Sequence, residues 1–175
     1  EGMNLEKLAA VAGLEACEVS LEASGNLKAS DDYAAISGAV ENLVYKGYRY
    51  APIEFSGHCA ADLITAKLGT DDPNAKLRLT AKYSIADDRM LKLTLRSDRI
   101  APTELNLYPG DKSQTFSFDL NGEYIDYGAG RTIVNAKIDN LYHMSGGDTT
   151  FVRNFYVSDN NAGDDRIFMV TSDFA

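Results

Sequence analysis

Apolar and polar residues alternate one by one along most of this chain, and this period constrains the fold more than any other feature. Apolar residues fall at odd positions between Cys17 and Ala29, and again between Ala75 and Ile85. Successive side chains of a strand point to opposite sides of a sheet. The pattern therefore predicts an antiparallel sheet with one apolar face and one polar face that is exposed to solvent. The apolar face must cover another layer of protein or a ligand.

The 175 residues are predicted to form one β-rich unit over 1–175. The exception is a short amphipathic helix within residues 1–13, which Asn4 caps and Gly13 ends. Residues 14–175 are predicted to form strands separated by turn signals such as Asp71 to Asn74. A slip in the apolar parity between Gly57 and Asp62 indicates a bulge or two strands. Predicted later strands include Met90 to Arg96, Leu105 to Leu107, Thr115 to Asn121, Thr132 to Leu141, Thr150 to Ser158 and Arg166 to Phe174, and a loop is predicted over Asp159 to Asp165.

The charge of the chain excludes some classes of partner. Its 26 acidic and 17 basic residues give a net charge of -9, whereas nucleic acid needs a basic footprint. The same charge argues against resting on an anionic membrane surface. No apolar run approaches the roughly 20 residues that span a bilayer. We expect the chain to be an internal fragment of a longer protein.

Residues that carry enzyme chemistry are not grouped in the sequence, so no catalytic, cofactor or metal site is predicted. The two histidines, His58 and His143, are far apart, and His143 precedes a predicted turn. The acidic pairs fall at turns and lack the spacing of a calcium loop. Cys17 and Cys59 are expected to be reduced and buried, the alternative being a cross-strand disulfide.

Several motifs resemble the AsmA/TamB superfamily, and in particular the TamB-like translocation and assembly module proteins of Gram-negative envelopes. The resemblance extends from about Leu5 to the end of the chain, and the order of the motifs is its most specific aspect. The motifs are Val44-Tyr45-Lys46-Gly47-Tyr48-Arg49-Tyr50 followed by Ile53, then Asp72-Pro73-Asn74, Leu105-Asn106-Leu107, Gly130-Arg131-Thr132-Ile133-Val134-Asn135 and Val170-Thr171-Ser172-Asp173-Phe174.

The resemblance implies a fold and a function. Such proteins are anchored in the inner membrane, cross the periplasm, and curl an extended sheet into an apolar groove. They are implicated in outer-membrane protein assembly with a BamA-like partner and in phospholipid transport between membranes. The expected contacts are therefore phospholipid or unfolded outer-membrane protein segments, in the periplasm and without catalysis.

The alternation also predicts which residues line the groove. Side chains that share a parity within one strand share a face, so Lys76, Arg78, Lys92 and Arg96 are expected on the opposite, wet face. The candidate groove residues are Val19, Leu21, Leu77, Leu79, Leu93, Leu95, Phe116 and Phe118.

A second interpretation remains open, because the same alternation also fits the core of a two-sheet sandwich. In that case the chain is a secreted carbohydrate-binding or adhesin domain. Its site would then be the loop Asp159 to Asp165 or the cluster of Tyr45, Tyr48 and Tyr50, whose rings could stack on sugars.

Overall fold

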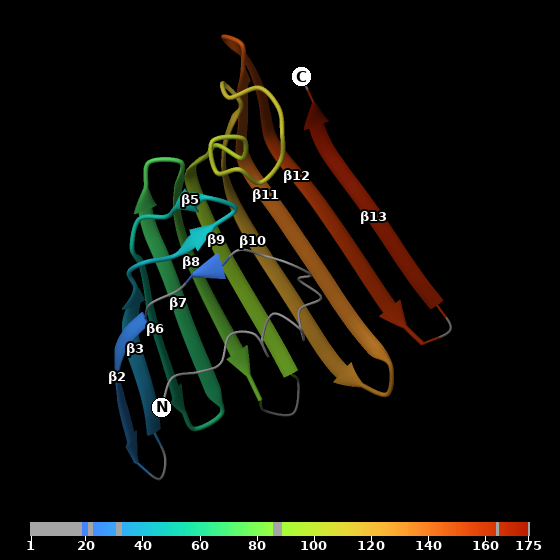
Figure 1. Ribbon diagram of the computed structural model, residues 1–175. Helices are drawn as coiled ribbons and strands as arrows, with labels where there is room; N and C mark the ends of the chain where they lie inside the picture. The colour runs from blue at the N-terminus through green and yellow to red at the C-terminus, as the bar shows by residue number, and fades with distance from the viewer. Residues whose placement is uncertain (1–18, 21–22, 31–32, 86–88, 164, 175) are drawn as a thin grey trace.

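A single antiparallel sheet of ten strands dominates the computed structural model, which describes residues 19–20, 23–30, 33–85, 89–163 and 165–174 (Figure 1). The strands follow the order β13-β12-β11-β10-β9-β8-β7-β6-β3-β2, and the small strands β1, β4 and β5 form a separate sheet. The bounds are β1 Val19–Ser20, β2 Ala23–Ser30, β3 Tyr33–Val40, β4 Val44–Tyr45, β5 Tyr48–Arg49, β6 Ile53–Ala60, β7 Leu63–Asp72, β8 Ala75–Ser84, β9 Arg89–Ile100, β10 Thr115–Gly128, β11 Arg131–Ser145, β12 Asp148–Ala162 and β13 Asp165–Phe174.

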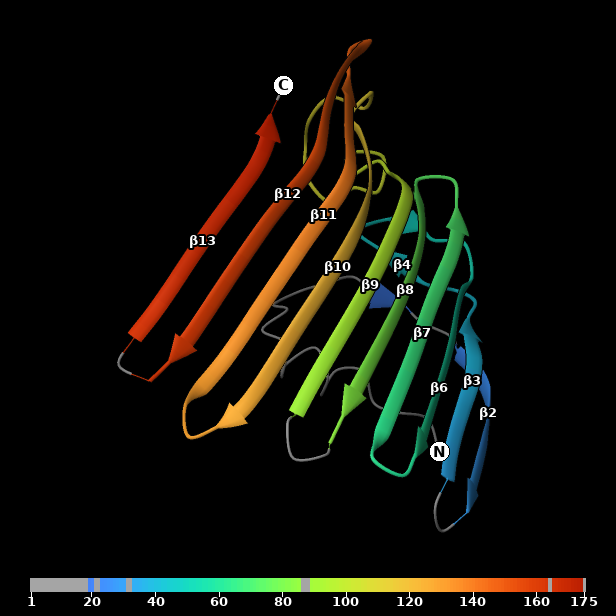
Figure 2. The same cartoon turned by 180° about the vertical axis from the view of Figure 1, so that it is seen from behind.

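The large sheet is open, with β2 at one edge and β13 at the other, as the view from behind also shows (Figure 2). The prediction of an all-β antiparallel fold is confirmed. The helix predicted within residues 1–13 lies outside the described residues, which contain no helix. Accordingly, no described helix is long and apolar enough to cross a membrane.

Several strand boundaries differ from the sequence prediction. The parity slip marks two strands, β6 and β7, joined by a tight turn at Ala61, whose φ is 47°. Leu105 to Leu107 lies in a turn-rich connection instead of a strand. The predicted loop Asp159 to Asp165 is largely strand, since β12 continues to Ala162 and turns at Gly163. His143 lies near the end of β11 and precedes the turn at Gly146 and Gly147, as predicted.

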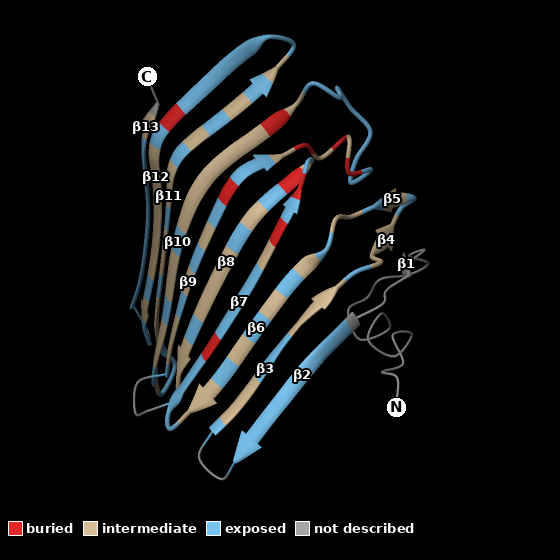
Figure 3. Cartoon of the chain, turned by 90° about the vertical axis from the view of Figure 1, so that its left-hand side faces the viewer, coloured by how far each residue is buried: buried red, intermediate tan, exposed pale blue. Residues whose placement is uncertain are grey.

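The tightly packed part of the molecule lies at one end of the strands, where most of the buried residues gather (Figure 3). Two connections meet there, one over residues 41–52 between β3 and β6, the other over residues 101–114 between β9 and β10. The amide of Asn106 donates to the carbonyl oxygen of Lys46 at 2.9 Å. We call these two connections the end cap.

A buried carboxylate anchors the end cap to the sheet. Asp72, at the end of β7, is 1% exposed and accepts three hydrogen bonds. The donors are the Tyr48 hydroxyl at 2.7 Å, the Ala51 backbone N–H at 2.7 Å and the Asn74 backbone N–H at 2.8 Å. Because two of these donors belong to the 41–52 connection, this carboxylate ties the connection to the sheet. Burial is the main cause that raises the pKa of Tyr48, and its hydrogen bond to Asp72 adds to it.

Candidate functional site: an uncovered apolar face

The register of the ladder shows which side chains share a face, because residues directly opposite in antiparallel strands point to the same side. Leu79 of β8 lies opposite Leu68 of β7 and Leu95 of β9, and Leu95 lies opposite Leu120 of β10. We call the side of the sheet that bears Leu79 the apolar face. The opposite side, the polar face, bears Arg78 opposite Arg96 and Lys82 opposite Lys92.

The register also assigns most of the candidate groove residues to one of the two faces. Leu77, Leu79, Leu93 and Leu95 lie on the apolar face, and so does Phe118, which is opposite Ser97. Phe116 shares the parity of Phe118 in β10 and stacks on the ring of His143, with 4.7 Å between the ring centroids. Val19 lies in β1 opposite Tyr45, outside the large sheet, and Leu21 lies outside the described residues.

The apolar face is not covered by a second sheet of comparable size within the described part of the chain. Large hydrophobic side chains of this face remain open to solvent. Among them are Leu27, Ile36, Ile64, Leu68, Tyr124, Val134, Phe168 and Val170.

Side-chain size varies in a regular way across the apolar face. In one row of opposed residues, which we call the small row, five of the six residues are small: Gly57, Ala66 and Ala81 on β6 to β8, and Gly122 and Ala136 on β10 and β11. Leu93 on β9 is the one large residue in this row. The two neighbouring rows are large. On one side lie Phe55, Leu68, Leu79, Leu95, Leu120 and Ile138, and on the other lie Cys59, Ile64, Tyr83, Leu91, Tyr124 and Val134.

A hollow of about 310 Å³ lies at one end of the small row. Gly57 and Ala66 line it together with larger apolar residues, including Leu27, Ile36 and Ile64. A Cβ atom at Gly57 would meet only ordinary contacts, 3.4 Å from Ile36 Cγ2 and 3.5 Å from the carbonyl oxygen of Thr65. The small residue at this position is therefore not dictated by the packing of its neighbours.

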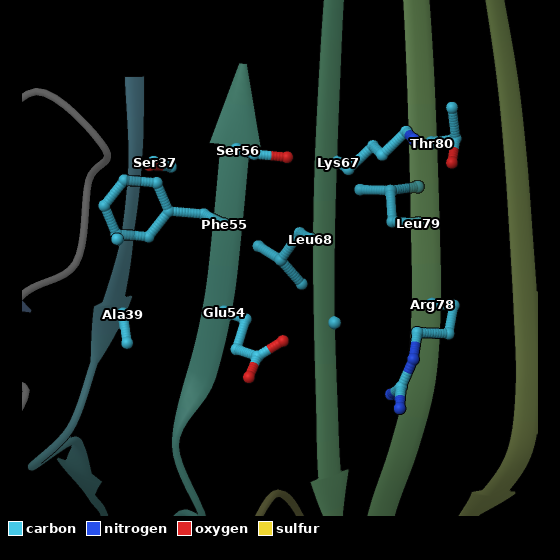
Figure 4. A pocket seen from close by; sticks show the side chains of 12 residues that line it. Ser37, Ala39, Glu54, Phe55, Ser56, Lys67, Leu68, Arg78, Leu79 and Thr80 are labelled. Atoms are coloured by element: carbon cyan, nitrogen blue, oxygen red, sulfur yellow. The ribbon is translucent and has the colours of Figure 1, made fainter. Parts of the chain in front are cut away.

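The polar face carries a different hollow, of about 500 Å³, over β3 and β6 to β8. Glu54, Lys67 and Arg78 line it together with the hydroxyl groups of Ser37, Ser56 and Thr80 (Figure 4). Arg78 folds across Gly69 and donates to both carboxylate oxygens of Asp71, at 2.8 and 2.7 Å. These charges are mostly exposed, which is typical of a solvated sheet surface.

Tyr48, Tyr50 and Cys59 lie in environments that are typical of residues that pack within the fold. Tyr48 and Tyr50 meet edge to face with 4.8 Å between their centroids, and the Tyr48 hydroxyl is engaged by Asp72. Cys59 is half-buried on the apolar face and free, whereas Cys17 lies outside the described residues. No group of three or more potential metal ligands occurs within the described ranges.

Sequence reasoning identified the apolar face but missed two features of it. The row of small residues depends on the cross-strand register, which no single strand reveals. The role of Asp72 depends on Tyr48, which lies 24 residues earlier. Comparisons with protein-family models, curated proteins and solved structures found no match to the chain.

Proposed function

We propose that this chain is a non-catalytic, groove-forming segment of a TamB-like envelope protein that holds apolar chains against its apolar face. The observation that carries the proposal is the apolar face itself, which runs across ten strands without a covering layer among the described residues. A surface of this extent on a protein marks a site for an apolar partner. The motifs that resemble the TamB-like proteins support the same assignment.

The small row suggests how a lipid tail would lie. From β6 to β11 the row crosses six strands, which spans about 24 Å at the usual strand spacing. One leaflet of a bilayer core is roughly 15 Å thick, so the row is long enough for an acyl chain, which would have to pass over the side chain of Leu93 on β9. Each methylene that leaves water contributes about 0.8 kcal/mol. In the full-length protein this segment would curl into a groove in the periplasm and pass phospholipid, or unfolded outer-membrane protein segments, towards a BamA-like partner.

Filling the small row tests the proposal. Gly57→Leu places a branched side chain in the hollow, and we expect the binding of a fluorescent fatty acid to weaken about tenfold or more. Ser56→Leu adds the same side chain one residue earlier, on the polar face opposite Lys67, and is expected to leave binding unchanged. Equal binding by both variants and the wild type would contradict a site on the small row.

The native ligand is a separate question, which mass spectrometry of co-purified material addresses. Phospholipid bound to the wild type and depleted in Gly57→Leu supports lipid transport. Protein purified without any lipid or peptide, and unable to bind the fluorescent fatty acid, would count against the proposed function.

A further inference from the structure

The aromatic ring of Tyr142 stands on the polar face, among charged and hydroxyl-bearing side chains. Asp119 of β10 lies opposite Arg96 of β9 and therefore belongs to the polar face. Ser117 shares the parity of Asp119, and Tyr142 of β11 lies opposite Ser117. Tyr142 is 42% exposed and stacks on Phe151 of β12, with 4.5 Å between the ring centroids. Phe151 therefore covers one face of the tyrosine ring, and the other face is turned towards β10.

A bulge in β9 widens the space in front of this ring. The register of β9 and β10 shifts beside Ser117, so this one residue of β10 faces both Asp98 and Arg99 of β9. Two adjoining hollows of about 270 and 120 Å³ lie there, and Asp98, Ser117 and Tyr142 line both of them. Pockets for drug-sized ligands measure about 300–1,000 Å³. The hollows are therefore of a size for a ligand of one or two rings, with the small Ser117 as their floor.

The polar groups around the hollows carry balanced charge. Arg96 Nε donates to Oδ1 of Asp98 at 3.1 Å, and the side-chain amide of Asn140 donates to Asp119 at 3.2 Å. Arg99 lines the smaller hollow and makes no hydrogen bond or ion pair with another described residue. Two guanidinium groups and two carboxylates leave no net charge. A neutral ligand with several hydroxyl groups suits this site better than an anion or a cation, because each hydroxyl can donate to a carboxylate or accept from a guanidinium.

From this arrangement we propose that the polar face carries a saccharide-binding site, in which a neutral sugar ring stacks on Tyr142. A pyranose ring presents a face of C–H groups, whose hydrogens suit the negative face of an aromatic ring. Its hydroxyl groups would bond to Asp98, Asp119, Asn140 and Arg99, and hydrogen bonds with an ionised partner are the stronger kind. The site lies on the opposite side of the sheet from the apolar face, so it does not rest on the proposed function.

Saccharide titrations of the whole chain, followed by NMR, test this proposal. The probes are glucose, maltose, cellobiose and N,N′-diacetylchitobiose, which are neutral and differ in linkage and substituents. We expect at least one of them to bind saturably and to shift the backbone amides of Ser117 and Tyr142. Saturation transfer from the protein should reach the C–H protons of the ring that stacks on Tyr142.

Filling the hollows is the decisive perturbation. Ser117→Leu raises their floor without removing a group that would bind the sugar, and we expect it to weaken binding about tenfold or more. Thr94→Leu makes a similar change on the polar face of β9, opposite Thr80 and outside both hollows, and should leave sugar affinity unchanged.

The stacking ring is tested separately. Tyr142→Ala removes it and should weaken binding about tenfold or more, whereas Tyr142→Phe keeps the ring and should retain most of the affinity. Fatty-acid binding should be unchanged in Ser117→Leu, and sugar binding should be unchanged in Gly57→Leu, so the failure of one site is distinguishable from the failure of the other.

Several results would overturn the saccharide site. One is the absence of saturable binding by all four probes. Another is binding that survives Ser117→Leu, or that shifts the amides of Tyr48 and Tyr50 in place of those at the hollows. Tighter binding of inorganic phosphate or tetramethylammonium at Ser117 and Tyr142 would show that the site takes a charged ligand, and would overturn the choice of a neutral sugar.

Discussion

Removing the carboxylate of Asp72 is expected to destabilise the fold much more than removing its neighbour. Asp72→Ala leaves the backbone N–H groups of Ala51 and Asn74 and the Tyr48 hydroxyl without their acceptor. Each buried donor left unpaired costs about 1–3 kcal/mol. Because the end cap can admit some water once it loosens, we expect a net loss of about 2–4 kcal/mol in the free energy of unfolding.

Asp71→Ala is the matched control, one residue away. Asp71 forms an ion pair with Arg78 in which both side chains are more than half exposed. Exposed pairs of this kind contribute about 0.2–1 kcal/mol, so a small change is expected.

Urea denaturation followed by circular dichroism measures both variants, and Asp72→Asn adds an intermediate case that keeps one acceptor oxygen. With an m value of about 1–3 kcal/mol/M, the midpoint for Asp72→Ala should fall by roughly 1–2 M. Hydrogen exchange should accelerate first in residues 41–52. If Asp71→Ala and Asp72→Ala proved equally stable, the carboxylate would not be the anchor of the end cap.

Three further predictions concern other parts of the chain. Leu79→Asp places a charge in the middle of the apolar face and should abolish fatty-acid binding, whereas Lys82→Asp on the polar face, opposite Lys92, should retain it; equal loss in both would indicate general damage. Burial and the hydrogen bond to Asp72 raise the pKa of Tyr48 in the folded state. The neutral hydroxyl should therefore contribute its full stability below about pH 10, and this contribution should fall as the pH rises further. When the free energy of unfolding is measured against pH, Tyr48→Phe should show a smaller decrease at alkaline pH than the wild type. Ser97→Ala deletes a buried hydroxyl that has no hydrogen-bond partner and should leave the urea midpoint unchanged or higher. Gly38→Ala should lower the midpoint, because its Cβ would clash with the carbonyl oxygen of Ser24.

Much of the fold was predictable because alternation is a local signal. The parity of Leu77 with Leu79, or of Leu93 with Leu95, is set within one strand and places these residues on one face without knowledge of the partners. Irregular positions were not predictable in this way. At Asn140, where φ is 54°, β11 contains one more residue than the paired segment of β10. The alternation of apolar and polar residues does not indicate this bulge.

The end cap was not predicted, because its contacts join residues that are far apart in the sequence. Leu105 and Leu107 alternate like strand residues, but Leu105 is buried in the turn-rich connection 101–114. The contacts of this connection come from residues about 60 positions earlier, such as the hydrogen bond between Asn106 and Lys46. The Asp-Pro-Asn turn could be identified from its residues, but the buried role of Asp72 within it could not.

The order of the strands has a consequence for how the chain reaches its structure. Every strand of the large sheet lies beside its neighbour in sequence, and β4 and β5 are the only described strands inserted between two members of it. Each strand therefore needs only the preceding one as a template, so the entropy of closing long loops is largely avoided. The sheet can assemble from one end to the other as the chain emerges from a ribosome or a translocation channel. By the same logic it can open from an edge one strand at a time, and a hairpin of two strands can be gained or lost without changing the register of those that remain.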